Sequence, residues 1–430
     1  MSGEDSAQIG PAQSGSAQSD SAQSDSAHSD SARRGAYLAL GLVLAAGLVN
    51  YVDRVTLSVA GPTIAGELHL RPSQMGLLFS AFLWTYGLAQ APVGAIIDRI
   101  GPRPLLAGAL TLWSAAQGAT GLAVGLPQLI VARLFLGLGE APQWPTGAKV
   151  VRAWFAPRVR GLATGVFNTA STLGPALAPP LVTGLMLTLG WRGAFFATAL
   201  AGLVMALIWI SFYREPPTEP GGEPTPPRTP WQRLFAAPAL WAMALGNVGS
   251  GYMNWFYAAW LPGYLETGRH LTVPQTGWAA SIPYLFGVVG SLVGGFACDR
   301  LAAAGLSPIL SRKLPIVCGL TVGGVFTGLA ILAPSSAGAI AAISAALFFS
   351  NLAGAAIWAM AITAAPPGGV ASVGAFQNFG GFVGGALAPI VTGFSVEATH
   401  SFAAALATTA LAALGGALVY LVGVRRPIEG

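Results

Sequence analysis

The sequence predicts an all-α integral membrane protein with twelve transmembrane helices in two pseudo-symmetric six-helix bundles. Hydrophobic residues make up 53% of the 430 residues, charged residues make up 9%, and the mean hydropathy is +0.63. Apolar stretches of about 20 residues, the length that crosses a bilayer, recur along the whole chain. A charged loop motif also occurs twice, at the same place in each half. This composition excludes a soluble multidomain protein.

Twelve apolar stretches are long enough to cross a bilayer as helices. Six belong to a first bundle, residues 36–213, and six to a second bundle, residues 236–424. The expected spans of the first bundle are 37–65, 74–97, 104–124, 127–150, 160–188 and 191–213. Those of the second bundle are 236–264, 275–299, 313–333, 337–364, 371–395 and 401–424.

Polar segments flank and separate the bundles. Residues 1–35 repeat a Ser-Ala-Gln-Ser-Asp theme and hold almost no large apolar residue, so we expect a disordered tail. Residues 214–235 are rich in Pro, Glu, Gly and Thr, which predicts a linker between the bundles. Residues 425–430 form a short polar C-terminus.

The basic residues predict the orientation, because cytoplasmic loops carry an excess of Lys and Arg. With both termini in the cytoplasm, the inner loops and ends hold sixteen Lys and Arg residues and the outer loops hold three. We therefore expect a multi-pass protein of the inner (plasma) membrane. The basic residues behind the formal charge of +5 lie in short loops, where they determine membrane topology, so no nucleic-acid partner is expected.

The repeated motif predicts that the two bundles are duplicated. Residues 94–103 read Gly-Ala-Ile-Ile-Asp-Arg-Ile-Gly-Pro-Arg, between the second and third spans. Residues 295–300 read Gly-Phe-Ala-Cys-Asp-Arg, between the eighth and ninth. The two aspartates are 201 residues apart. Duplicated halves suggest alternating access to a site between them, and they need no second copy of the chain to build a pathway.

Asp53 and Arg54 stand side by side inside the first apolar span. Each charge costs about 2.5–3.5 kcal/mol at the centre of a membrane helix. Adjacent helical residues point about 100° apart, so each must face a protein interior or a wet cavity. The pair is either a structural ion pair or a titratable acid beside an anchor for an anion.

Arg133 and Glu140 are the second buried pair. Of the sixteen acidic residues, only Asp53 and Glu140 lie deep inside expected spans. Arg133 and Glu140 share a helix face but lie about 10 Å apart along the axis, too far for a direct bridge. Each must therefore find its partner on another helix, and Asp53 and Arg54 of the first span are candidates. A structural ion network and a proton-and-anion site both fit this pattern.

Weaker candidates lie in the second half. Asn254 and Tyr257, three residues apart on the seventh span, share a face that could contact a substrate. The other aromatic residues of that span favour packing. The four histidines are not clustered, so no metal site is expected, and no phosphate-binding loop or other cofactor motif occurs.

The loop motif resembles the signature of the major facilitator superfamily. Further segments resemble its anion:cation symporter family, which includes bacterial permeases for hexuronate, galactonate, glucarate and phthalate-type acids. These segments are Asn-Tyr-Val-Asp-Arg at 50–54, Phe-Ser-Ala-Phe-Leu-Trp-Thr-Tyr at 79–86, Arg-Leu-Phe-Leu-Gly-Leu-Gly-Glu-Ala-Pro at 133–142, and Arg-Ala-Trp-Phe at 152–155 leading to Arg-Gly at 160–161.

The resemblance implies a role for each matching residue. Asp53 and Glu140 match protonatable carboxylates, and Arg54 and Arg133 match basic residues near the anion. The implied substrate contacts further along the chain are Tyr86 and Asn378, and Ser171 stands where sugar-acid permeases often have glutamine. The shorter Ser171 hydroxyl leaves room for a different or smaller acid than a polyhydroxylated sugar acid.

The loop motif implies a charge latch at the cytoplasmic ends of the spans. In this latch Asp98 would accept hydrogen bonds from a neighbouring helix terminus and from arginines. The residues assigned to the latch are Asp98, Arg99, Arg103, Asp299 and Arg300.

Together these features predict a secondary active transporter that imports a small organic anion with protons, and not an enzyme. Two other functions stay open at this point. A proton-coupled exporter of amphipathic compounds would suit a cavity dominated by aromatic residues. A non-transporting sensor with a transporter fold would bind a ligand without flux.

Overall fold

The computed structural model describes residues 14–216, 229–366 and 368–428. Each of the twelve expected spans is helical, which confirms the fold class. The helices of the first half are α1 Ser14–Glu67, α2 Pro72–Ile100, α3 Pro102–Gly121, α4 Leu126–Glu140, α5 Gln143–Trp154 and α6 Pro157–Phe212. Those of the second half are α7 Trp231–Ala236, α8 Pro238–Gly263, the π-helix η1 Tyr264–Gly268, α9 Val273–Ala303, α10 Pro308–Leu332, α11 Ser336–Ala364, α12 Val370–Thr399 and α13 Ala403–Gly423.

Proline marks where many of these helices begin. Seven helices carry a proline at the first or second position, where the missing N–H costs no hydrogen bond. These helices are α2, α3, α4, α6, α8, α9 and α10. The helix starts therefore follow directly from the local sequence.

Two expected spans differ in detail. The span 127–150 consists of two helices, α4 and α5, because the helix is interrupted at Ala141 and Pro142. The spans 160–188 and 191–213 are joined as α6, whose only non-helical backbone angles lie at Gly190 (φ 71°). Glycine adopts this left-handed conformation without the steric cost of a Cβ, so the chain turns there between two membrane crossings.

The polar segments differ from expectation in part. The backbone of residues 14–35 is helical and continuous with the first span, where we predicted disorder. An existing helix end removes the cost of nucleation, so alanine- and glutamine-containing sequence extends it. The first part of the predicted tail and the middle of the predicted linker lie outside the described residues, and the linker's last residues form α7.

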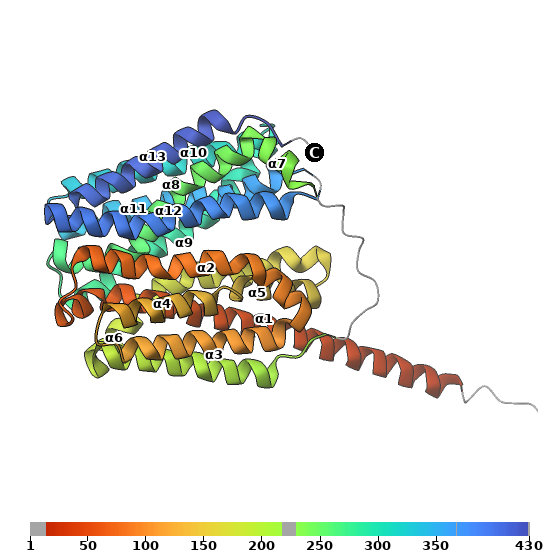
Figure 1. The fold of residues 1–430 in the computed structure, drawn as a ribbon. Helices are drawn as coiled ribbons and strands as arrows, with labels where there is room; N and C mark the ends of the chain where they lie inside the picture. The colour runs from red at the N-terminus through yellow and green to blue at the C-terminus, as the bar shows by residue number, and fades with distance from the viewer. Residues whose placement is uncertain (1–13, 217–228, 367, 429–430) are drawn as a thin grey trace, which may run out of the picture.

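The helices pack as two groups, one built from α1–α6 and the other from α7–α13 (Figure 1). The two groups use the same pairings. In the first, α1 packs on α6, α2 on α4, and α3 on α4 and α6. In the second, α8 packs on α12, α9 on α11, and α10 on α11 and α13. The contacts between the groups are also matched, since α2 packs on α12, α6 on α9, and α1 on α8.

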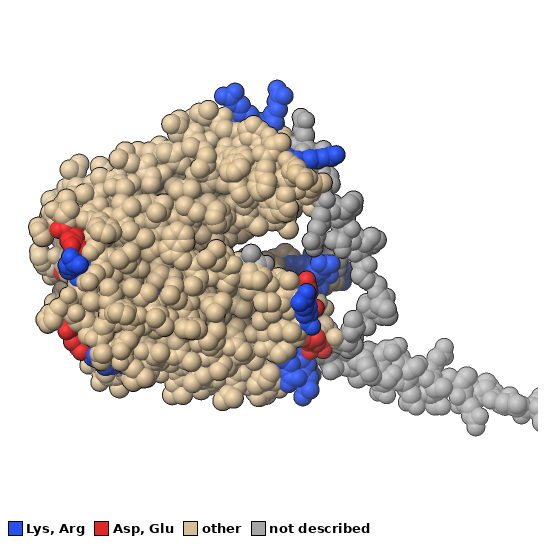
Figure 2. All heavy atoms as spheres, viewed as in Figure 1, with Lys and Arg blue, Asp and Glu red and all other residues tan. Residues whose placement is uncertain are grey.

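The surface shows which part of the molecule lies in the membrane. Charged side chains gather at the two ends of the helices and leave an uncharged belt between them (Figure 2). Seven of the described helical segments are individually long and apolar enough to cross a membrane. The chain is therefore a multi-pass membrane protein. We call the end from which both termini leave the terminal end and the opposite one the far end (Figure 1).

The two bundles are joined at the far end and separated at the terminal end. One apolar core at the far end combines residues of both bundles, such as Val59 and Phe256. Toward the terminal end the core divides into one cluster around Trp113 and another around Met243. Figure 2 shows a hollow between the bundles that opens at the terminal end. We call this hollow the chamber.

Candidate functional site

The site is built around Arg54, halfway along the membrane-spanning part of α1. Its Nε donates a hydrogen bond of 2.5 Å to Oε2 of Glu140 at the end of α4. The Glu140 side chain is fully buried and that of Arg54 is 9% exposed. We expected Arg133 and Glu140 to find partners on the first span, and the structure confirms this for Glu140.

Three aromatic rings surround the Arg54 guanidinium. Its central carbon lies 5.1 Å from the ring centre of Tyr51, 4.9 Å from that of Phe82 and 4.7 Å from that of Tyr86. A cation within about 6 Å of an aromatic ring is attracted by the electron-rich face. The rings and Glu140 together hold the charge at the edge of the first bundle. Tyr86, predicted as a substrate contact, lies at this position.

Two glycines allow α4 to bring Glu140 to this place. A Cβ at Gly137 would overlap the carbonyl oxygen of Phe82 on α2, and one at Gly139 would overlap the backbone of Trp113 on α3. Only glycine permits such close approach of helix backbones in a membrane. The segment 133–142 therefore works as a unit, in which the glycines set the position of the carboxylate.

Asp53 points away from Arg54, as the 100° step between neighbouring residues requires. Its side chain is completely buried inside the first bundle, where Thr198 of α6 and Trp113 of α3 lie beside it. Neither carboxylate oxygen has a hydrogen-bond partner among the described residues. A buried ionised carboxylate without a partner is very costly, so Asp53 depends on the polar groups of α3, α4 and α6 that surround it.

Arg133 completes the buried network. It is 3% exposed, and both Asp53 and Glu140 are near enough to act on its charge. Its Nε and Nη2 atoms have no hydrogen-bond partner within the described part of the chain. Arg54 thus keeps 9% of its side chain exposed at the boundary with the second bundle, whereas Asp53, Arg133 and Glu140 are buried inside the first bundle.

Asn50 was missed by sequence reasoning although it opens the segment 50–54. It is fully buried, one helical turn before Arg54, and its amide lies beside the Glu140 carboxylate. A polar residue within a membrane helix that already carries two charges was the available signal. Gln117 of α3 is a second residue of the buried network that sequence reasoning missed. Its amide donates to the backbone oxygen of Asp53 (3.4 Å) and to the Thr198 hydroxyl (3.1 Å).

The two predicted substrate contacts on α8, Asn254 and Tyr257, point into the interior of the second bundle. Tyr257 is fully buried and its hydroxyl pairs with that of Thr327 on α10 at 2.9 Å. Tyr257 is therefore corrected to a packing residue, because the face it shares with Asn254 is directed at α10 and α11. The Asn254 amide donates to the Ser250 carbonyl (3.0 Å) and the Ser350 hydroxyl (3.2 Å).

Ser171 and Asn378 are half-buried on α6 and α12. The Ser171 hydroxyl donates to the Asn168 carbonyl of its own helix at 2.7 Å, so in this conformation it satisfies the backbone. Asn378 differs from its neighbour Gln377, which is buried and donates to the Ile357 carbonyl at 2.9 Å. Of these two amides, only that of Asn378 is partly exposed.

The predicted latch is only partly present. Asp98 pairs with Lys149 of α5 at 3.0 Å, and Lys149 also donates to the Ile97 carbonyl at 2.8 Å. The partner is a lysine of the same bundle instead of the expected arginines. Arg99 and Asp299 are exposed, and Arg300 lies over the ring of Phe296, 4.9 Å from its centre. In the described residues, the second copy of the motif therefore has no matching ion pair.

Arg103 has a different role, which Lys313 repeats in the second bundle. Arg103 donates to the Ile210 carbonyl (2.6 Å) in the last turn of α6. Lys313 donates to the Leu421 (3.2 Å) and Val424 (3.1 Å) carbonyls at the end of α13. Cations bind favourably at helix C-termini, where backbone carbonyls lack partners. Each bundle thus fastens its last helix to its third.

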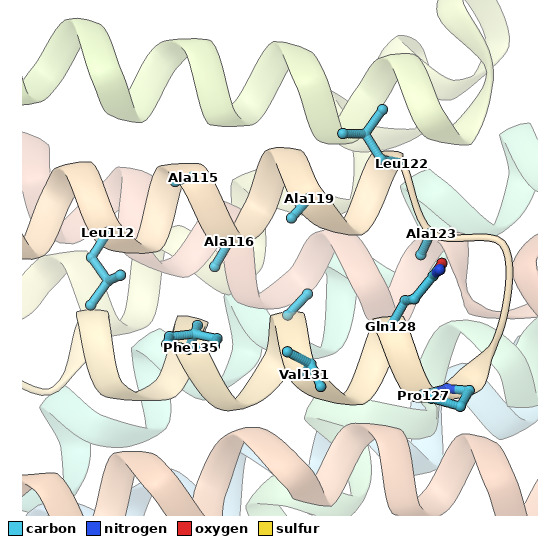
Figure 3. A pocket seen from close by; sticks show the side chains of 11 residues that line it. Leu112, Ala115, Ala116, Ala119, Leu122, Ala123, Pro127, Gln128, Val131 and Phe135 are labelled. Atoms are coloured by element: carbon cyan, nitrogen blue, oxygen red, sulfur yellow. The ribbon is translucent and has the colours of Figure 1, made fainter.

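Two cavities lie outside this site. One of about 610 Å³ lies between α3 and α4, and apart from Gln128 its lining is apolar (Figure 3). Its walls include Leu122 and Phe135, which are more than half exposed on the outside of the bundle, so it faces lipid. The other, of about 120 Å³, lies between the bundles near Trp260 at the far end.

Two duplicated helical halves with charges buried near their boundary are typical of membrane transport proteins. Comparison with known proteins defines the family. The family model described as "Major Facilitator Superfamily" matches residues 43–389. The chain belongs to the major facilitator superfamily, and within it to the organic-acid permeases.

The similar proteins include two curated bacterial transporters. A "Probable L-galactonate transporter" of Escherichia coli (strain K12) is 40% identical over 406 residues, 91% of this chain and 90% of that protein. A "Hexuronate transporter" of Bacillus subtilis (strain 168) is 33% identical over 395 residues, 90% and 93% of the two chains. A crystal structure of a bacterial homologue of the human lysosomal transporter Spinster has the same fold, with a TM-score of 0.73, 19% identity, and coverage of 90% and 93%.

Proposed function

We propose that this chain is a proton-coupled symporter that imports a sugar acid across the inner membrane. The single observation that carries the proposal is the 2.5 Å ion pair between Arg54 and Glu140 at the boundary between the bundles. An arginine offers a planar fork that matches a carboxylate, and Glu140 occupies it here. A substrate carboxylate and Glu140 therefore compete for one guanidinium.

This competition supports coupling between protons and substrate. When Glu140 takes up a proton, its attraction for Arg54 weakens, and Arg54 becomes free to bind the anion. Protonation of Asp53 removes the second buried negative charge, so the loaded bundle carries less uncompensated charge when the chamber closes. The two halves then change their relative orientation and the site faces the other side. Arg133 belongs to the buried network in this cycle, and the substrate is held by Arg54, Tyr86 and Asn378.

The sidedness follows from the basic residues. Sixteen Lys and Arg residues are assigned to the loops and chain ends on the side of the two termini, against three on the other side, which supports a cytoplasmic terminal end. A chamber that opens at this end then corresponds to an inward-open state. Both termini are then cytoplasmic. Because each chain holds both halves of the pathway, we propose that it works as a monomer.

The relatives support the substrate class. The curated transporters described above carry the names of L-galactonate and hexuronate. A carboxylate chain bearing hydroxyl groups suits one arginine at the boundary between the bundles and an amide such as that of Asn378. The buried charge favours an anion carrier over an exporter of amphipathic compounds, because lipid-like molecules need no guanidinium.

The test is uptake of radiolabelled L-galactonate into proteoliposomes with an imposed proton gradient, acidic outside. We expect the wild-type carrier to accumulate L-galactonate and Asp53→Asn to lose gradient-driven accumulation. Glu67→Gln is the control, because the Glu67 side chain is 46% exposed and belongs neither to the buried network nor to the latch. An Asp53→Asn carrier that still accumulates the acid in response to the gradient would contradict proton coupling. Binding without flux in the wild type would favour the sensor function.

A further inference from the structure

The charges at the chamber all come from one bundle. Asp53, Arg54, Arg133 and Glu140 belong to the first bundle. In the described helices of the second bundle, charged residues lie near helix ends, as Asp299 in the last turns of α9 does. A substrate anion therefore binds the first bundle through its carboxylate. The second bundle has to bind the uncharged remainder of the molecule if both bundles are to respond to it.

At the level of Arg54, the second bundle contributes two aromatic rings. The Trp255 ring of α8 lies 6.1 Å from that of Phe82, and the Phe382 ring of α12 lies 5.4 Å from that of Tyr86. Phe82 and Tyr86 are rings that surround Arg54. Because the Phe82 ring lies 4.9 Å from the guanidinium carbon and 6.1 Å from the Trp255 ring, Trp255 is within about 11 Å of the Arg54 charge. An extended hexose-derived acid held by Arg54 is long enough to bring its carbon chain to this ring.

Glycine places the Trp255 ring. A Cβ at Gly385 on α12 would overlap the indole of Trp255, whereas Gly380 and Gly384 on the same helix face backbone carbonyls of α8. These last two serve close helix packing, as expected. Gly385 instead leaves room for a side chain. Trp255 is half-buried, unlike the fully buried Trp113, so part of this residue stays accessible while its ring lies beside Phe82 of the first bundle.

From this arrangement we infer that Trp255 is a specificity-determining residue that binds the carbon chain of the acid held by Arg54. The inference rests on the proposed function and deepens it. The flat indole packs against the C–H groups of an extended polyol chain, and its N–H is a donor for a hydroxyl. Trp255 thereby favours long hydroxylated acids over short ones. Because the Trp255 ring also contacts Phe82 of the first bundle, a substrate long enough to bind Trp255 contacts both bundles.

The experiment measures competition in proteoliposomes. Unlabelled L-galactonate and the shorter acid glycerate each compete with uptake of labelled L-galactonate, in wild type, Trp255→Ala and Trp255→Phe. We expect Trp255→Ala to raise the KM for L-galactonate about tenfold, equal to about 1.4 kcal/mol of lost binding. The inhibition constant of glycerate should stay nearly unchanged, because this acid has only two carbons beyond its carboxylate to pack against the ring. Trp255→Phe, which keeps a ring, should lie within about threefold of the wild type.

Glycine variants provide a matched pair. Gly385→Ala should reproduce the loss of L-galactonate affinity, because its Cβ displaces the indole. Gly354→Ala on α11 is the control, since a Cβ there meets no atom within 4 Å. Equal weakening of both acids in Trp255→Ala, or unchanged competition by both, would overturn the inference while the wild type still transports. A wild type that transports no sugar acid would instead overturn the proposed function, so the two failures are distinguishable.

Discussion

The carboxylate of Glu397 accepts a hydrogen bond of 3.0 Å from the backbone N–H of Ser73, across the boundary between the bundles. Glu397 lies in the last turn of α12 and Ser73 in the first turn of α2, where backbone N–H groups lack partners within the helix. Arg71 lies 3.6 Å from the same carboxylate. Beneath this contact, a Cβ at Gly76 or Gly393 would overlap backbone of the opposite bundle. The far end is therefore closed by close helix packing and fastened by Glu397.

Removing the Glu397 carboxylate should loosen this closure. We expect Glu397→Ala to shift the equilibrium toward a state open at the far end, since a charge-assisted cap contributes about 0.5–2 kcal/mol. The reporter is Met75→Cys, a position that is 3% exposed and lines the far-end cavity, in a Cys318→Ser background. A membrane-impermeant maleimide should label it several times faster in Glu397→Ala.

Glu67→Ala is the matched control for this measurement. Glu67 also binds an arginine at the far end, Arg192, together with the Trp191 indole at 2.5 Å, but all three belong to the first bundle. Its loss should leave the labelling rate of Met75→Cys unchanged. Equal labelling in the Glu397→Ala and Glu67→Ala proteins would show that Glu397 does not hold the bundles together.

Glu140→Gln should separate proton coupling from substrate exchange. The amide cannot carry the charge that holds Arg54, so Arg54 stays available to the anion at any pH. We expect proton-driven uptake of L-galactonate to fall about tenfold or more while exchange of internal for external L-galactonate persists. Parallel assays of uptake and counterflow in one proteoliposome preparation measure both. Equal loss of both activities would assign Glu140 a structural role.

The packing of α8 on α12 should be sensitive to one methyl group. A Cβ at Gly384 would overlap the Val248 carbonyl oxygen, and overpacking of this kind costs about 1–3 kcal/mol. We therefore expect Gly384→Ala to lower the Tm of the detergent-solubilised protein. At Gly415 on α13 a Cβ meets nothing within 4 Å, so Gly415→Ala should be neutral or slightly stabilising. Similar Tm values for the two variants would contradict the packing argument.

Glu266 should make stability depend on pH. Burial raises the pKa of this carboxyl, outside the membrane spans in η1, from 4.5 to about 7. The folded protein then binds this proton more tightly than the unfolded chain, so its stabilising effect is complete below pH 4.5 and is lost as the pH rises through about 7. Glu266→Gln stays neutral, and should exceed the wild-type Tm at pH 8 by about a degree or two but match it at pH 4.5. A constant difference between the two proteins at both pH values would exclude Glu266 as the cause.

Much of the site could be predicted because its residue types are rare in membrane helices. Charges at 53, 54, 133 and 140 stand out against an apolar background, and their cost requires that they meet partners inside the protein. The helix step of 100° also predicts that Asp53 and Arg54 diverge, as they do. Tyr257 was placed wrongly because a polar aromatic residue on an apolar helix fits a cavity and a packed interior equally well.

Hydropathy and the duplicated motif by themselves determined the membrane fold, the number of crossings and the kinds of charge that had to be buried, because lipid tolerates only helices that satisfy their own backbone. The tertiary structure decided which charges meet and which face the chamber. Glu140 reaches Arg54 through the glycines of α4, and Asp53 turns inward to α3 and α6. Trp255 meets Phe82 across the bundle boundary because Gly385 leaves room for its ring. Such contacts join residues far apart in the chain, and helix packing, which no local pattern encodes, brings them together.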